Sequence, residues 1–338
     1  NPFTLTGWTF KGWNTAETGS GTYYADQAPI TLNDQGTVSL YAQWIKESTD
    51  GSITVPGEDK IPGNEDDVTA KPGNGGSLKR DDKTGEITVP NGGSAVNKDG
   101  EIDLPNGGTV KPDGTITIKQ PDGPDIVVKP DGTTEPGEDG KQIFCLTYRS
   151  AEGNLKDVKV YFKDGTTVKV KADAMTREGY KLGQWLNGNA LVPFGTVISK
   201  TTTLTAKWYK VNDDGSVTVP GKDGSIDPDN GNDNVTVKPG VGGTTPDVDN
   251  DGKVTVPDNG NGTGTVVTPD GELVVPGGSK VDPDGTITDP DNKQLYPSTD
   301  PDDPNKTPDG YFKVTYKSGE SGVDNQKDVI QLVKTGEK

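Results

Sequence analysis

Aromatic residues are confined to three parts of this chain, and that confinement limits where a compact core can form. The sequence holds 5 Trp, 10 Tyr and 6 Phe residues. They lie within 1–44, within 144–209 and from Tyr296 onward, while 45–143 and 210–295 contain none. Large rings supply much of the buried area of a small core. We therefore expect small folded blocks where the rings are, and thinner structure between them.

The composition argues against one large core. Of 338 residues, 47 are Gly and 26 are Pro, and only 28% are hydrophobic. The mean hydropathy is −0.73. A chain of this kind buries too little apolar surface to offset the backbone entropy of a single globule, so it is either partly disordered or built from thin repeated units.

Charge and missing residue types exclude several functions. The formal net charge is −18, which repels a phosphate backbone or an anionic membrane, so we expect no nucleic-acid partner. Histidine is absent, which removes the commonest general base and indicates that the chain is not an enzyme. The one cysteine, Cys145, forms no disulfide within the chain and is expected to be a buried strand residue. No apolar run is long enough to predict a membrane span in this fragment, and no export leader is recognisable.

Two of the aromatic blocks share one pattern. The first opens with GWTFKGW at Gly7 and closes with SLYAQW at Trp44. The second opens with GYKLGQW at Gly179 and closes with TLTAKW at Trp208. Short β-rich runs separated by turn residues predict a small antiparallel sheet in each block. We expect the cores of these modules to contain four tryptophans, namely Trp13, Trp44, Trp185 and Trp208.

The opening GYxFxGW and the closing LxAxW resemble the Listeria/Bacteroides repeat, also called the internalin B-repeat. The resemblance covers about 1–44 and 143–209, and the second copy departs from the pattern at Leu182, where an aromatic residue is usual. It implies β-grasp-like modules of a large bacterial protein. It also implies an extracellular location, at the bacterial cell surface or in the cell wall.

The third aromatic block repeats only the opening half of the second. YFKVTYKSGESG from Tyr311 parallels IFCLTYRSAEGN from Ile143, and the first block lacks this half. When Lys338 is placed before Asn1, the two ends read as one uninterrupted module. Either the parent polypeptide consists of covalent tandem repeats, or separate copies join head to tail by strand donation. The smooth join favours the covalent tandem.

The aromatic-free segments also carry a regular pattern, in which an Asp-Gly or Thr-Gly turn precedes two apolar residues spaced two apart. Examples are DGSITVP from Asp50 and DGSVTVP from Asp214. This spacing predicts short strands within a narrow β-solenoid-like or hairpin-repeat segment. Disordered Gly/Pro linkers are the alternative. Pairs of side chains expected to point inward are Ile87 and Val89, Ile102 and Leu104, and Ile116 and Ile118.

The sequence DVDNDGKVTVPD suggests calcium as a cofactor. Its oxygen-bearing residues follow the spacing of a calcium-binding loop, with a glycine, Gly252, at the sixth position. An Asp stands where a bidentate Glu is usual, and the flanking residues are strand-like, so a solvated acidic turn is the alternative. The predicted ligands are Asp247, Asp249, Asp251, Lys253 through its carbonyl, and Asp258.

These observations predict a mainly β protein, and the family resemblance implies that β-grasp-like modules alternate with the narrow β-solenoid-like or hairpin-repeat segments. We expect a structural repeat unit of an extracellular bacterial stalk or filament. The alternative is an adhesin module that binds host glycan or protein through exposed rings such as Trp8, Tyr23 and Tyr24. The expected division is a C-terminal module part at 1–47, a β-repeat segment at 48–141, a complete module at 142–209, a second β-repeat segment at 210–308, and an N-terminal module part at 309–338.

Overall fold

The structure is a computed structural model that describes all residues except 18, 20, 32–36, 136–138, 153, 222–232, 301, 304, 318–327 and 337–338. The predicted join at Lys338 lies outside the described residues. The chain divides into two compact units, 1–168 with 197–203, and 169–196 with 204–338. Strands dominate both units, and the only helical element in the described residues is the 3-10 turn η1 (Val241–Gly243). The mainly β prediction is confirmed.

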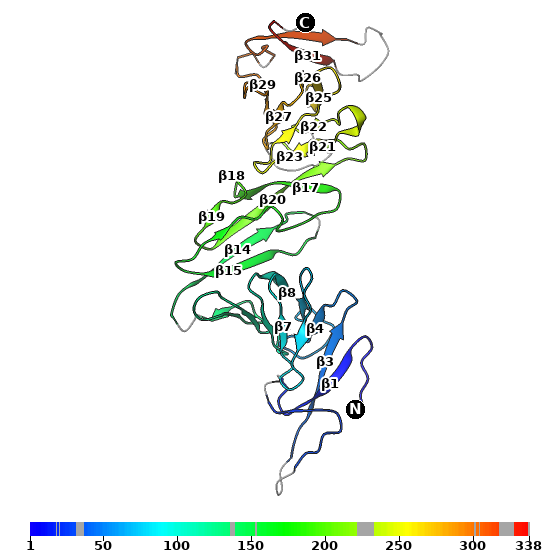
Figure 1. The fold of residues 1–338 in the computed structure, drawn as a ribbon, viewed down its shortest axis with the longest axis vertical. Coiled ribbons are helices and arrows are strands. Elements are labelled where there is room, and N and C mark those ends of the chain that lie inside the picture. Colours follow the sequence, from blue (N-terminus) through cyan, green and yellow to red (C-terminus); the bar gives the residue numbers. More distant parts are fainter. Residues whose placement is uncertain are drawn as a thin grey trace. The chain divides into compact units, whose positions relative to one another are not determined.

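The main sheet of the first unit runs from the first aromatic block into the aromatic-free segment, and Figure 1 labels its strands β1, β3, β4, β8, β14 and β15. Successive pairings run β2-β1-β3-β4-β5-β8-β9-β15-β14. All are antiparallel except β9 with β15, which is parallel. The strands are β1 (Thr9–Asn14), β2 (Tyr23–Tyr24), β3 (Tyr41–Glu47), β4 (Ile53–Val55), β5 (Val68–Lys71), β8 (Gly93–Asn97), β9 (Gly100–Leu104), β14 (Ile143–Arg149) and β15 (Val158–Lys163).

A second sheet of the first unit has the order β6-β7-β10-β11-β12-β13, and the pairings along it are antiparallel. The chain alternates between the two sheets in hairpins: β4 and β5 belong to the first, β6 and β7 to the second, and β8 and β9 to the first again. The strands are β6 (Lys79–Arg80), β7 (Ile87–Val89), β10 (Gly108–Val110), β11 (Ile116–Ile118), β12 (Ile126–Val128) and β13 (Thr134–Glu135).

The core of this sandwich is a thin layer of aliphatic side chains from both sheets. One cluster joins residues such as Val68 and Leu104 of the first sheet to Val110 and Ile126 of the second. All six side chains predicted to point inward are buried, so the described part of this segment is folded β structure and the linker alternative is wrong there. They are Ile87, Val89, Ile102, Leu104, Ile116 and Ile118.

Asp-Gly turns connect these strands as the sequence predicts. The Asp113 side chain accepts a hydrogen bond from the Thr115 amide at 2.9 Å, which closes a turn around Gly114. Gly114 has φ of 82°, a conformation that a residue with a Cβ adopts only with strain. The same side-chain contact to the amide two residues on occurs at Asp50, Asp131, Asp214 and Asp284.

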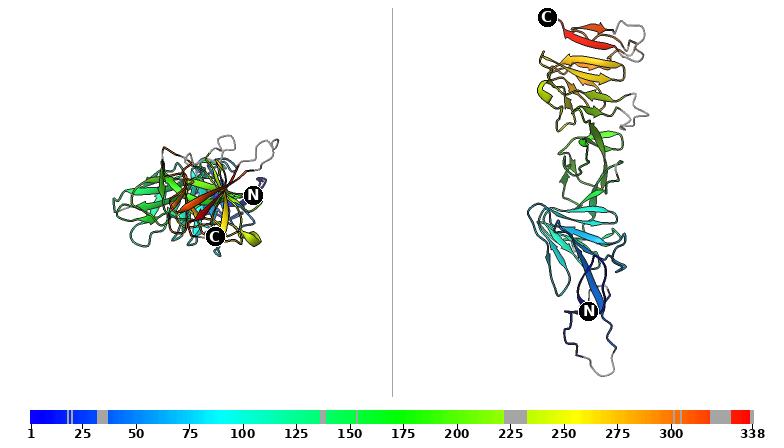
Figure 2. Two further views of the ribbon diagram at one scale, coloured as in Figure 1. Left: turned by 90° about the horizontal axis from the view of Figure 1, so that it is seen from above. Right: turned by 90° about the vertical axis from the view of Figure 1, so that its right-hand side faces the viewer.

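The second unit repeats this plan, and its strands are drawn in green through red in Figure 1 and from two further sides in Figure 2. Pairings run β18-β17-β20-β21-β22-β25-β26-β31-β30, with β26 and β31 parallel. The strands are β17 (Tyr180–Asn187), β18 (Ala190–Val192), β20 (Thr202–Val211), β21 (Val217–Val219), β22 (Val235–Val237), β25 (Thr263–Thr268), β26 (Gly271–Pro276), β30 (Tyr311–Tyr316) and β31 (Val329–Lys334).

Its second sheet has the order β23-β24-β27-β28-β29, and one cluster of buried side chains again joins the two sheets. Tyr209 on β20 enters this core, where its hydroxyl donates to the Gly252 carbonyl at 2.7 Å. The strands are β23 (Asp247–Val248), β24 (Val254–Thr255), β27 (Lys280–Val281), β28 (Ile287–Thr288) and β29 (Gln294–Tyr296). Two further short strands of the chain are β16 (Val168–Lys169) and β19 (Val197–Ile198).

Individual side-chain contacts recur at the same places in the two units. Lys71 on β5 pairs with Glu101 on β9 at 3.1 Å, and Lys238, the residue after β22, pairs with Glu272 on β26 at 2.7 Å. The Thr54 hydroxyl lies 2.9 Å from the Thr69 hydroxyl on the next strand, and the Thr218 hydroxyl lies 2.9 Å from that of Thr236 in the same way. The sandwich is therefore one structural plan built twice in this chain.

No helix in the described part of the chain is long and apolar enough to cross a membrane.

Candidate functional site

The predicted calcium ligands Asp249, Asp251 and Lys253 lie together in the turn between β23 and β24. One carboxylate oxygen of Asp249 accepts hydrogen bonds from the amides of Asp251 at 3.0 Å and Lys253 at 2.9 Å. Its other oxygen accepts from the Lys280 ammonium group at 2.6 Å. Partial burial acts to raise the pKa of Asp249, but the hydrogen bonds from Lys280 and the Lys253 amide outweigh it and lower the pKa. Both oxygens of Asp249 therefore already have partners.

Of the remaining predicted ligands, Lys253 and Asp258 already have hydrogen-bond partners, and Asp247 lies on a strand. The Lys253 carbonyl accepts a hydrogen bond from the Asp249 amide, and Asp247 lies on β23 opposite Thr255. Asp258 lies beyond the other end of β24, where its side chain accepts from the Gly260 and Gly262 amides. No group of three or more acidic or sulfur side chains suited to a metal occurs among the described residues. The arrangement favours the acidic-turn alternative, and calcium binding stays a prediction.

Cys145 shows no feature of a reactive thiol. It lies on β14, partly buried, with its sulfur 3.6 Å from the Thr147 hydroxyl. Burial raises the pKa of its thiol, so the thiolate that would act as a nucleophile is disfavoured at neutral pH. A structural role on the strand is consistent with this environment.

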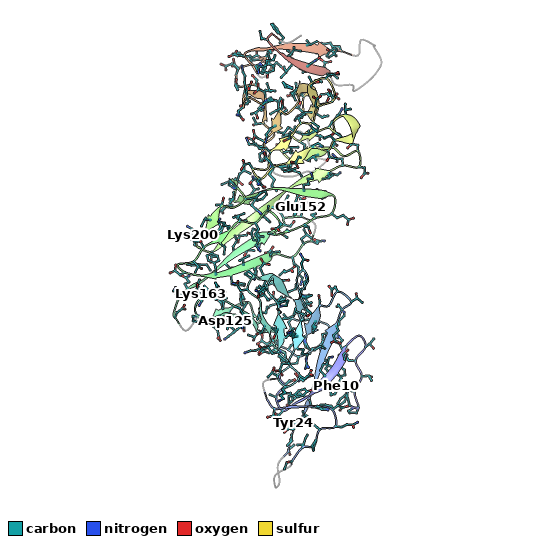
Figure 3. All side chains as sticks on the ribbon, in the orientation of Figure 1. Phe10, Tyr24, Asp125, Glu152, Lys163 and Lys200 are labelled. Atoms are coloured by element: carbon teal, nitrogen blue, oxygen red, sulfur yellow. The ribbon has the colours of Figure 1, made fainter. Side chains whose placement is uncertain are left out.

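The tyrosines predicted to bind ligands differ in their surroundings. The Tyr23 hydroxyl donates to the Lys11 carbonyl at 2.6 Å, and its ring covers Gly12 so closely that a Cβ there would lie 2.4 Å from it. Tyr23 therefore holds the bulge of β1 in place. Tyr24, on β2, is half-buried, and it is labelled in Figure 3.

Rings on β1 and β3 gather on one face of the first block. Phe10 and Trp13 meet edge to face with ring centroids 5.0 Å apart, and Phe10 and Trp44 with centroids 5.5 Å apart. Phe3 approaches Trp13 at 6.0 Å and leaves 57% of its surface exposed. We call the set Phe3, Phe10, Trp13, Ala42 and Trp44 the aromatic face.

The equivalent residues of the second module are better covered. Aligning GWTFKGW with GYKLGQW, and SLYAQW with TLTAKW, matches the aromatic face with Met175, Leu182, Trp185, Ala206 and Trp208. All of these except Leu182 are buried. The prediction of tryptophan cores is therefore confirmed for Trp185 and Trp208, whereas Trp13 and Trp44 are only half-buried.

The same contrast separates the two copies of the module's opening strand. On β14, Leu146 and Tyr148 are completely buried. Their equivalents on β30, Val314 and Tyr316, expose 40% and 53% of their surfaces. Phe312 lies on the same face, because residues two apart on a strand point to the same side, and it exposes 61%. We call Phe312, Val314 and Tyr316 the β30 face.

The two faces are the strongest candidates for contact with a partner. Single exposed apolar residues are ordinary, but three on one strand, as on β30, are typical of an interaction site, and the aromatic face gathers one exposed and several half-buried rings. The rings were visible in the sequence, yet the pattern alone did not distinguish the buried copy of each strand from the exposed one.

Comparison with known proteins adds no identification. No protein-family model matches the chain, and no curated protein matches it. The resemblance of the modules to the internalin B-repeat therefore stays a prediction.

Proposed function

We propose that this chain is a structural repeat unit of an extracellular bacterial surface stalk or filament. The observation that carries the proposal is the duplication of one plan within the chain. In each unit a hairpin of a Trp-containing module leads into a sandwich, which pairs in parallel with the opening strands of the following module copy. A plan that recurs with its connections intact extends by simple repetition.

The packing of the sandwiches suits a repeated unit. Each core is formed by side chains of its own unit, so every added unit contributes its own stability and requires no central core. The antiparallel hairpins that alternate between two sheets favour the hairpin-repeat form of the predicted segments over a solenoid. The β-grasp description of the modules, and the fivefold division at 1–47, 48–141, 142–209, 210–308 and 309–338, belong to this proposal.

The charge of the chain supports the same role. A net charge of −18 keeps neighbouring fibres apart and soluble and disfavours binding to nucleic acid. The proposal assigns no catalytic residue, because the sequence lacks histidine and the single thiol is disfavoured as a nucleophile. The location at the cell surface or cell wall rests on the family resemblance.

Two measurements test this proposal. Electron microscopy of the purified protein should show fibres, and globular particles alone would contradict the structural role. Denaturing electrophoresis of native material distinguishes the two modes of assembly. A band near 35.5 kDa indicates separate chains joined head to tail, whereas a much larger chain indicates covalent tandem repeats.

An adhesin is the second candidate, and the exposed ring of Phe3 and the half-buried ring of Tyr24 favour it. Tyr24→Ala and Phe3→Ala are suitable variants, because neither residue closes the Gly12 bulge as Tyr23 does. A glycan array and binding to host cells should show signal for the native protein and a loss in these variants. Equal signals from native and variant proteins would count against the adhesin.

A further inference from the structure

We propose that the β30 face binds the aromatic face of a second copy of this chain, in a head-to-tail contact. This inference rests on the proposed structural function and names the surfaces that join its units. The first step is the difference in exposure described above. Leu146 and Tyr148 are buried on β14 and their equivalents Val314 and Tyr316 are exposed on β30, although both strands form the same antiparallel hairpin with the strand that follows.

The second step identifies the occupant. In the central module, the opening half at 143–168 is followed along the chain by the closing half, which ends at Trp208. Besides this closing half, the chain carries a sequence of the same pattern in 1–44. That sequence presents the aromatic face, whose members are less covered than their equivalents in the central module. The chain thus holds the two complementary halves on separate surfaces.

A contact within the first unit indicates how the halves engage. The backbone amide of Cys145 on β14 donates to the Thr201 hydroxyl at 3.3 Å, so the segment 197–203 lies against this strand. The equivalents are the Lys313 amide on β30 and the exposed hydroxyl of Thr37. The difference between Cys145 and Lys313 does not affect this donor, because the donor is the backbone amide.

Strands β30 and β3 both have backbone available for such pairing. In the described part of the chain, β30 pairs with β31 only, and β3 pairs with β1 along Tyr41–Ile45 and with β4 at its end. An edge strand that adds to another sheet gains main-chain hydrogen bonds, while side-chain contacts give specificity. Because the two faces differ, the contact is heterologous and repeats from copy to copy.

Sedimentation equilibrium of the full chain tests the contact. The average mass of the native protein should exceed 35.5 kDa and rise as its concentration is increased to about 1 mM. Two partners joined by a short flexible linker have an effective concentration of about this size, so it is a suitable upper limit. Val314→Asp should weaken association at least about 30-fold, as expected for a charge in the centre of an interface. Val241→Asp is the matched control, because Val241 is 62% exposed on η1 and lies on neither face.

Mixing two variants tests the head-to-tail arrangement. Val314→Asp retains the aromatic face, and Phe3→Asp retains the β30 face, so each variant alone should remain a single chain. A 1:1 mixture should form a species of two chains. The proposal is overturned if the native protein stays at 35.5 kDa throughout, if Val314→Asp associates as tightly as Val241→Asp, or if the mixture does not associate.

Hydrogen exchange of the native protein tests the contact without any substitution. Protection of the Lys313 amide should increase with protein concentration, while that of the Val241 amide should not. Unchanged protection of Lys313 overturns the proposal even if Val314→Asp fails to fold. Fibres that persist in folded Val314→Asp would overturn this contact and leave the structural function standing. Absence of fibres in the native protein would contradict that function itself.

Discussion

Leu146 on β14 is completely buried, whereas Val314, at the equivalent position of β30, exposes 40% of its surface. The two residues have the same place in the same hairpin and similar apolar character. Local sequence therefore does not decide their exposure. This difference is the observation behind the proposed contact of β30 with a second copy, and Tyr148 and Tyr316 differ in the same way.

Truncation of a core residue should show that the buried aliphatic layer stabilises the sandwich. Ile116→Ala removes a completely buried side chain of β11, and we expect a loss of about 2–5 kcal/mol in the free energy of unfolding. Urea denaturation measures it. Val241→Ala should change the free energy by less than about 0.5 kcal/mol, because Val241 is exposed. Equal effects of the two substitutions would contradict the buried core.

Removal of one hydroxyl should destabilise the second unit. Tyr209→Phe leaves the buried Gly252 carbonyl without its 2.7 Å donor, which should cost about 1–3 kcal/mol. The control is Tyr316→Phe, whose exposed hydroxyl donates to the Gln331 side chain at 2.8 Å. Urea unfolding at low protein concentration should show little change for the control. A Tyr209→Phe protein as stable as the native one would show that this hydrogen bond contributes nothing.

Acid should weaken the Asp-Gly turns. The amide and hydroxyl of Ser52 lower the pKa of Asp50, and the hydroxyl and amide of Ser216 lower that of Asp214. A pKa lowered by folding stabilises the protein above the unfolded value of about 3.9, and this contribution is lost as pH falls through the folded pKa. The melting temperature should therefore fall steeply below about pH 4.

The variant Asp50→Asn with Asp214→Asn separates the turns from the remaining carboxylates. Asn keeps the side-chain oxygen that closes the turn but does not titrate. Its melting temperature should depend less on pH in the acid range than that of the native protein. Identical acid profiles for the two proteins would exclude a contribution from these turns.

If the acidic-turn alternative is correct, calcium should not raise the melting temperature. The Asp249 oxygens accept hydrogen bonds from two amides and from Lys280, and Asp258 serves a separate turn. A ligand that binds only the folded state stabilises it further as the ligand concentration rises above the dissociation constant, so thermal melting with excess calcium and with a chelator compares the two states directly. A rise in melting temperature that Asp249→Asn abolishes would restore the calcium interpretation.

The local structure of the aromatic-free segments could be predicted from the sequence. Ile102 and Leu104 lie two apart after an Asp-Gly turn, and this spacing places both on one face of a strand. The register of an adjacent strand was harder to foresee. On β8, Ala95 faces the core and Val96 is half-buried, because pairing with β5 and β9 fixes which side is inward.

The candidate sites were less predictable. The spacing of Asp249 and Asp258 satisfied a calcium-loop pattern, yet β24 lies between them and places them in different turns. A strand advances about 3.3 Å per residue, so ligands that a compact loop would gather are instead separated. The sequence likewise predicts an exposed ring at Tyr23, but this ring fills the space above Gly12.

The sequence by itself determined the short strands, the Asp-Gly turns, the inward aliphatic pairs and the two related modules, because these depend on periodicity and on local backbone preferences. Only the tertiary structure decided that hairpins alternate between two sheets, that β9 and β26 meet β15 and β31 in parallel, and that Val314 and Tyr316 stay exposed. Those outcomes depend on contacts between residues far apart in the chain, and residues with nearly identical local sequence acquire different neighbours.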